Sequence, residues 1–452
     1  MPGVPNGRAC EGCRKQKKKC DEKTPSCGRC TRLALVCVGS GQQRFKFKEH
    51  QALRSSQKTK PPEAKIPGIS VIQVYRIPKS ELTLLATSFI QTISPTTDIR
   101  YNLAWTYGIF LEEIPRRLGK NEALDTSIAA LVSSHSSFCA GQKISVDALM
   151  KYSHALKALR NCLDDRSKAH ESETLCSVMI LMICQSFIGI DNGVWTGHSE
   201  GATQLLKARG YLDIKDDFEC KLLLSLRGPV LFESLFNAKI NFSSWEWQTF
   251  VENPLDGDTL EGKMMHSLTR VPGFMLRRRK QLQSGIDDPS LVDEVRSNYD
   301  NYQPVLAAIR ERLMAIRLSP PIKGFKGPDN DFISILLERA YGIGLTIGII
   351  LNQILSAIDV GNTDLASEST FFAKEIMILN ESAPKHGPVG GGYIELCLVA
   401  VLLGTNDEAI IAHAEEEFAN FYKNMRNGHK MSTKAALEKT RRRILLLDVG
   451  ES

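Results

Sequence analysis

The sequence has little of what marks secreted proteins and metalloenzymes. Its first nine residues, MPGVPNGRA, hold no apolar run, so we expect no secretory signal and cysteines that stay reduced. Its nine histidines include no HExxH motif or other ligand pair at helical spacing, which argues against a catalytic metal site. Strand patterns are sparse along the whole chain. These absences favour a reduced, mainly helical protein that is not an enzyme.

Acidic residues are scarce in one region. Residues 1–60 contain 15 Lys and Arg but only 4 Asp and Glu, a net charge of +11. The other 392 residues contain 42 Lys and Arg and 47 Asp and Glu, a net charge of −5. A local basic block of this kind indicates a polyanionic partner such as nucleic acid.

One stretch is long, apolar and free of charge. Residues 340–358 lie between Arg339 and Asp359 and include several polar side chains and three glycines. We therefore expect a buried helix of a helical domain rather than a membrane span, and no membrane partner.

Six of the 12 cysteines fall within 28 residues and form an internal repeat. The pattern Cys-x2-Cys-x6-Cys occurs twice, with each cysteine displaced by 17 positions from its counterpart. Two tetrahedral zinc ions need eight ligand positions, which six thiolates supply when two of them bridge both metals. The first cysteine of each half is the natural bridge. The predicted ligands of two zinc ions are Cys10, Cys13, Cys20, Cys27, Cys30 and Cys37.

Three other interpretations of these cysteines exist: a disulfide knot, a mononuclear finger with spare cysteines, and a thiol-rich metal store. The absent signal argues against the first, and the strict repeat argues against the other two. Structural metal also explains how about 30 residues with few large apolar side chains can fold. The remaining cysteines are scattered among apolar residues and are predicted to be small core residues: Cys139, Cys162, Cys176, Cys184, Cys220 and Cys397.

The six-cysteine motif, together with Arg14, Lys17, Asp21 and Pro25, resembles the fungal binuclear zinc cluster transcription factors. The matching stretch covers under a tenth of the chain, but it is very specific. The resemblance implies that each half is a short helix and an extended segment wrapped on zinc. It also implies that the first helix enters the major groove of double-stranded DNA, commonly over a CGG triplet.

All the residues between the second and third cysteines are basic or polar. Because this basic run has no apolar face to pack against a core, we expect the metal to hold it in place. Lysines near a helix end can donate to guanine O6 and N7 or neutralise phosphates. Lys17 matches the base-reading position of the family, whereas Gln16 stands where the family usually has Arg or Lys. Glutamine pairs more naturally with adenine, so Gln16 changes the expected base preference. The predicted DNA-binding residues are Arg14, Lys15, Gln16, Lys17, Lys18 and Lys19, with Lys17 on bases and the others mainly on phosphate.

We predict three regions: a binuclear zinc cluster domain at 8–40, a linker at 41–79, and an α-helical regulatory domain at 80–450. The linker region is rich in Pro, Gly, Lys, Gln and Ser, and 44–48 alternates like a short extended piece. No sustained heptad pattern supports a coiled coil, so a homodimer through the helical domain and monomeric binding both remain open.

Helical patterns dominate the third region. We expect Asp147 to cap a helix over the apolar positions that follow it. Tyr152, His198 and Gly201 with their neighbours resemble the fungal-specific regulatory domain of the same family, which implies regulation. Further helices are predicted at 173–190, 195–209, 291–318, 332–358, 365–379 and 409–425.

The leading hypothesis is a nuclear, zinc-dependent, sequence-specific DNA-binding transcription factor. It would regulate RNA polymerase II genes together with the transcription machinery or co-regulators. An alternative is an α/β-hydrolase-like enzyme, because residues 197–201 match G-x-S-x-G with Ser199 as nucleophile, although no buried strand precedes them. A second alternative is a protein-interaction scaffold that the zinc module tethers to DNA.

Overall fold

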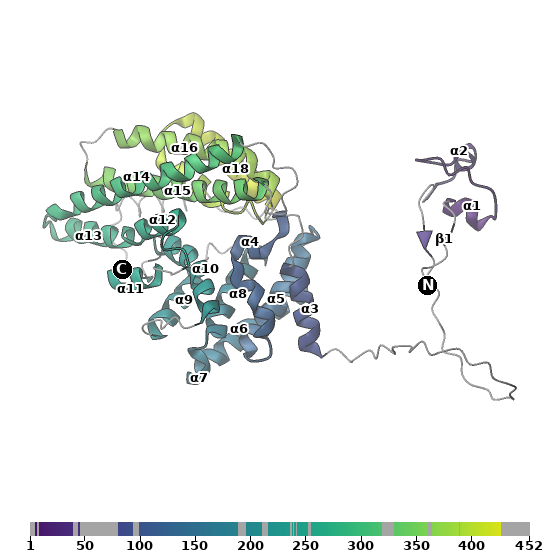
Figure 1. The fold of residues 1–452 in the computed structure, drawn as a ribbon, viewed down its shortest axis with the longest axis horizontal. Coiled ribbons are helices and arrows are strands. Elements are labelled where there is room, and N and C mark those ends of the chain that lie inside the picture. Colours follow the sequence, from purple (N-terminus) through teal and green to yellow (C-terminus); the bar gives the residue numbers. More distant parts are fainter. Residues whose placement is uncertain are drawn as a thin grey trace, which may run out of the picture. The chain divides into compact units, whose positions relative to one another are not determined.

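The chain forms two units, Met1–Arg76 and Ile77–Ser452, in the computed structural model (Figure 1). The residues that the structure describes are 5–6, 9–38, 44–45, 80–93, 99–188, 196–209, 216–235, 237, 239–240, 242–251, 255–318, 330–359, 364–387 and 389–425. Most of the predicted linker at 41–79 lies outside these residues, so the three predicted domain boundaries stay a prediction.

The first unit contains two very short helices, α1 (Glu11–Lys15) and α2 (Gly28–Arg32). A five-residue helix is not stable by itself in water, because forming its first turn costs more than its few hydrogen bonds return. Two strands, β1 (Pro5–Asn6) and β2 (Arg44–Phe45), pair antiparallel. The predicted extended piece at 44–48 is therefore confirmed for its first two residues, and the rest lies outside the described residues.

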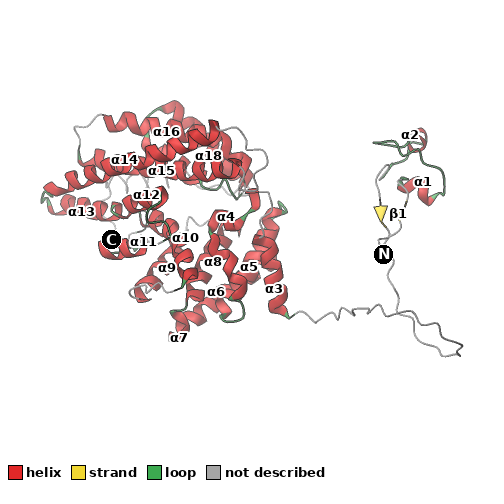
Figure 2. Ribbon diagram, in the orientation of Figure 1, coloured by secondary structure: helices red, strands yellow, loops and turns green. Residues whose placement is uncertain are grey.

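The described part of the second unit consists of helices, with no strand among them (Figure 2). Its first helices are α3 (Glu81–Ile93), η1 (Ile99–Tyr101), α4 (Leu103–Tyr107), η2 (Ile109–Arg116), α5 (Glu122–Cys139), α6 (Val146–Asp164), α7 (Arg166–Ala169), α8 (Ser172–Ile188), α9 (Thr196–Arg209) and α10 (Asp217–Ser234). The later helices are α11 (Ser244–Val251), α12 (Leu260–Thr269), α13 (Val271–Ser284), α14 (Pro289–Leu318), α15 (Asn330–Ile358), α16 (Asp364–Ser382), η3 (Ala383–His386), α17 (Ile394–Gly404) and α18 (Glu408–Met425). The predicted fold class, a small cysteine-rich module followed by a large all-α domain, is confirmed.

Two helices lie at the centres of the packing in this unit. In the earlier part, α5 packs against α6 and α8, and the middle of α8 is buried on all sides. In the later part, α15 packs against α14 and α16 (Figure 1), and also against α17. Within the described residues, α15 is the one helix long and apolar enough to cross a membrane, but 72% of its most apolar window is buried. The prediction of a buried core helix at 340–358 is thus confirmed.

The other predicted helices are all present, but two details differ from the sequence-based expectation. Ser145 caps α6, because its Oγ accepts the N–H of Ala148 at 3.1 Å. Asp147 lies within the first turn instead, where it accepts from Lys151. Cys139 is exposed rather than buried, whereas the other five scattered cysteines are buried as expected.

Candidate metal centre and nucleic-acid interface

The six N-terminal cysteines meet at one point of the first unit. Their Sγ atoms form two groups of four, and within each group all Sγ atoms lie within 4.8 Å of one another. The groups are Cys10, Cys13, Cys20 and Cys27, and Cys10, Cys27, Cys30 and Cys37. Cys10 and Cys27 thus belong to both groups, the sharing pattern that two bridged metal ions require.

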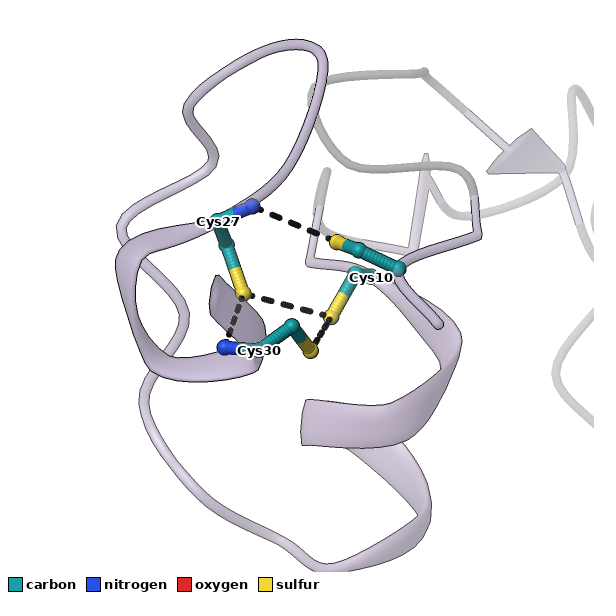
Figure 3. Close-up of side chains that lie close together, drawn as sticks. Cys10, Cys27 and Cys30 are labelled. Atoms are coloured by element: carbon teal, nitrogen blue, oxygen red, sulfur yellow. Dashed lines mark hydrogen bonds between the residues drawn. The ribbon is translucent and has the colours of Figure 1, made fainter. Parts of the chain in front are cut away.

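The spacing of the sulfurs agrees with tetrahedral zinc. The Sγ of Cys10 lies 3.7 Å from that of Cys27 and 3.7 Å from that of Cys30 (Figure 3). Four sulfurs around zinc at Zn–S distances of about 2.3 Å are about 3.8 Å apart. None of the chain's cysteines forms a disulfide. The donor set therefore fits a cluster of two zinc ions rather than a disulfide knot.

The two shared cysteines each begin a helix and accept a hydrogen bond from its backbone. Cys10 and Cys27 are the N-caps of α1 and α2, and each Sγ accepts the N–H of the residue three positions on, at 3.4 Å. This backbone hydrogen bond lowers the pKa of both thiols. Burial instead raises the pKa of the Cys13 thiol to about 12. The backbone thus favours the thiolate form of the two shared sulfurs, whereas burial disfavours it at Cys13.

The two halves of the motif repeat in three dimensions as well as in sequence. Lys17 and Ala34, which are 17 positions apart, have φ angles of 51° and 50° and turn the chain out of each helix. Asp21 joins the halves, because its carboxylate accepts the N–H of Gly28 at 3.0 and 3.1 Å. A Cβ on Gly28 would lie 2.8 Å from that carboxylate, so the close approach requires glycine.

The basic run lies on the surface of this module. All six predicted DNA-binding side chains are exposed, but α1 ends at Lys15, so only the first two belong to the helix. Gln16 is the C-cap of α1, and the three lysines that follow lie beyond the helix. Lys15 also pairs with Glu11 within α1 at 3.1 Å.

One neighbour of the basic run was not identified from the sequence. Arg29 of α2 donates from Nη2 to the Oε1 of Gln16 at 2.6 Å, across the two halves of the module. The two residues are 13 positions apart, and nothing in the sequence pattern links them.

In the helical unit, Ser199, the proposed nucleophile of the enzyme alternative, directly follows His198, one of the residues that resemble the regulatory domain. The hydroxyl of Tyr152 in α6 and the Nε2 of His198 in α9 lie 2.9 Å apart in a hydrogen bond. Ser199 follows inside α9 with 1% of its surface exposed, and its Oγ has no hydrogen-bond partner among the described residues. A nucleophile elbow needs an exposed serine between a strand and a helix of an α/β sheet. The described residues of this unit form helices and include no strand, so they give the α/β-hydrolase alternative no support.

Comparisons with known proteins agree with these two sites. Residues 8–46 match the fungal Zn(2)-Cys(6) binuclear cluster domain, and residues 84–227 match the fungal specific transcription factor domain. An uncharacterized protein of Emericella nidulans is 21% identical over 281 residues, which are 58% of this chain and 59% of that protein. The chain thus spans less than two thirds of that relative's length, and no solved structure matches it. The chain thus carries a fungal Zn(2)-Cys(6) binuclear cluster domain, which binds two zinc ions, followed by a fungal specific transcription factor domain.

Proposed function

We propose that this protein is a nuclear regulator that reads a CGG-type triplet in the major groove and controls RNA polymerase II genes. The observation that carries the proposal is an exposed polycationic run, from Arg14 to Lys19, held on a module whose buried residues are cysteines. Such a run has no apolar surface to bury, and its charge matches the phosphate backbone of a duplex.

All six cysteines of the motif are the proposed zinc ligands, with Cys10 and Cys27 bridging. The bound zinc ions supply the cross-links that hold α1 and α2 together in place of an apolar core. Two Zn2+ ions and six thiolates carry a net charge of −2, so residues 1–60 keep about +9 of their +11. The module therefore stays strongly attracted to DNA.

Within the run, Lys17 is the proposed base-reading residue, and the other basic side chains contact phosphate. Lys17 directly follows the C-cap of α1, where its positive φ directs the chain away from the helix. Support for the division of roles comes from the family resemblance and from lysine's ability to donate to guanine O6 and N7.

The helical domain, proposed to cover 80–450 after a linker at 41–79, carries regulation. Its proposed partners are co-regulators or the transcription machinery, and a second copy of the chain. The Tyr152–His198 hydrogen bond supports a fixed arrangement of α6 and α9 in the region that matches the family's regulatory domain.

The proposal is tested by selecting duplexes from a random pool with the full chain, with and without a chelator, while zinc is counted. We expect two zinc ions per chain and chelator-sensitive enrichment of a CGG-type triplet. Affinity should fall steeply with salt, because bound phosphates release counterions. One zinc ion or none would overturn the cluster, and binding that enriches no sequence would overturn base reading.

A further inference from the structure

Arg29 occupies a position between the cysteine cluster and the end of the basic run. It lies in α2, with its Nη1 buried, and its Nη2 donates to Gln16 Oε1 at 2.6 Å. On the cluster side it lies near Cys13. Burial raises the pKa of the Cys13 thiol, and the side chain of Arg29 lowers it in part. The guanidinium thus lies beside the cluster and donates to Gln16.

The chemistry of the two side chains fixes which end of the amide Arg29 contacts. A guanidinium has five N–H donors and no acceptor, so the atom that faces it must be the oxygen of Gln16. The NH2 group of Gln16 is then the end left to face a ligand, and Gln16 is an exposed residue of the run. Arg29 therefore orients Gln16 as well as touching it.

This orientation changes which base Gln16 can read. Bidentate pairing of glutamine with adenine needs the amide NH2 to donate to N7 and the amide oxygen to accept from N6. Here one lone pair of the oxygen already accepts from a cation, and the positive charge disfavours a second N–H donor at the other lone pair. Guanine presents two acceptors, O6 and N7, in the major groove and needs only the NH2 group.

We propose that Arg29 is a positioning residue that makes Gln16 a donor to guanine rather than a partner of adenine. The inference rests on the proposed DNA-reading function. The sequence suggests an adenine preference for Gln16 alone. The inference replaces it with a guanine preference, which a residue of the other half of the motif sets.

The test compares base preferences of the zinc-loaded full chain and three variants by selection from a random duplex pool. Loss of preference in Gln16→Ala identifies the base pair that Gln16 reads. At that pair the unaltered chain should select guanine, and Arg29→Met should shift the guanine-to-adenine ratio about tenfold toward adenine. Arg32→Met is the matched control, because Arg32 is an exposed arginine of the same helix and its loss removes the same charge. This control should bind more weakly on all sequences and keep guanine.

Three outcomes would overturn the positioning role of Arg29. The first is an Arg29→Met variant that holds two zinc ions and keeps the base preference of the unaltered chain. The second is an Arg32→Met variant whose base preference shifts as much as that of Arg29→Met. The third is a Gln16→Ala variant that loses its preference at no base pair. If Arg29→Met loses zinc, Gln16→Glu decides, because it keeps Arg29 and the cluster. A carboxylate cannot donate, so this variant should lose guanine and gain cytosine, which offers its N4 donor. Retained guanine in Gln16→Glu would contradict the inference. Failure of the unaltered chain to enrich any sequence would instead remove the proposed DNA-reading function, and the inference with it.

Discussion

The Sγ atoms of Cys10 and Cys27, two residues 17 positions apart, lie 3.7 Å from each other at the centre of the first unit. Each cysteine begins a short helix, and each belongs to both groups of four sulfurs. The buried hydrophobic cluster of this unit consists of cysteines among the described residues. Its fold therefore depends on metal ligation rather than on apolar burial.

Replacing one shared sulfur should remove both metal sites. We expect Cys27→Ser to lose both zinc ions and DNA binding, because Cys27 belongs to both sulfur groups and folding of such a module is coupled to metal binding. Zinc per chain, measured by atomic absorption, checks this outcome. Cys139→Ser is the control, since Cys139 is an exposed cysteine of the helical unit and its loss should leave the zinc content unchanged. Two zinc ions retained in Cys27→Ser would rule out the bridging role.

Zinc affinity should fall as the pH falls. Thiols must lose their protons to bind zinc, and burial raises the pKa of Cys13 to about 12, so protons compete with the metal at neutral pH. Zinc uptake by the metal-free protein should therefore release protons, and acidification should release zinc. Titration from pH 8 toward pH 4 with a chromogenic chelator measures the release, and circular dichroism shows whether the helical unit persists. Zinc affinity that does not change over this range would contradict thiolate ligation.

The cluster could be predicted from the sequence because metal chemistry constrains residues that are close in the chain. A strict repeat of Cys-x2-Cys-x6-Cys specifies ligand type, number and symmetry, and the structure brings the same six sulfurs together. The helices of the second unit were also predictable, since periodicity is a local property.

Contacts between distant residues could not be predicted in this way. The Arg29–Gln16 and Tyr152–His198 hydrogen bonds join residues 13 and 46 positions apart, and no spacing in the sequence shows that either pair is in contact. The sequence predicts Asp147 as the cap of α6, whereas Ser145 is the cap. Both are good capping residues, and only the backbone distinguishes them. The exposure of Cys139 follows from its place as the last residue of α5, which periodicity did not locate.

Loss of Lys17 should reduce sequence discrimination, whereas loss of Lys18 should not. Lys17→Ala is expected to lose about 1–3 kcal/mol of preference for the contacted base pair, because its donor to guanine is removed. Lys18→Ala, the matched control in the same exposed run, should weaken binding equally on all sequences and reduce the salt slope by about 1. Competition binding on specific and random duplexes at several salt concentrations measures both effects. Equal losses on both duplexes in Lys17→Ala would contradict its base-reading role.

In the helical unit, Glu338 joins three helices through a buried carboxylate. It is 5% exposed in α15 and accepts from Arg317 of α14 at 2.8 Å and from Ser382 of α16 at 2.9 Å. His386 lies 3.7 Å away. Burial alone would raise the pKa of Glu338, but these three partners outweigh burial and hold it at about 2, below the ordinary 4.5.

Glu338→Gln should therefore destabilise the helical unit in a pH-dependent way. At pH 7 we expect a loss of about 1–3 kcal/mol, because two hydrogen bonds to a charged group become hydrogen bonds to a neutral amide. Since the folded pKa lies below the unfolded one, the carboxylate's contribution is complete above pH 4.5 and declines as the pH falls toward 2. The difference in urea midpoint between the unaltered chain and the variant, followed by circular dichroism, should shrink over that range. Glu416→Gln, at an exposed position of α18, should leave the midpoint unchanged. A Glu338→Gln difference that stays constant from pH 7 to pH 3 would show that the charge of Glu338 does not stabilise the junction of these helices.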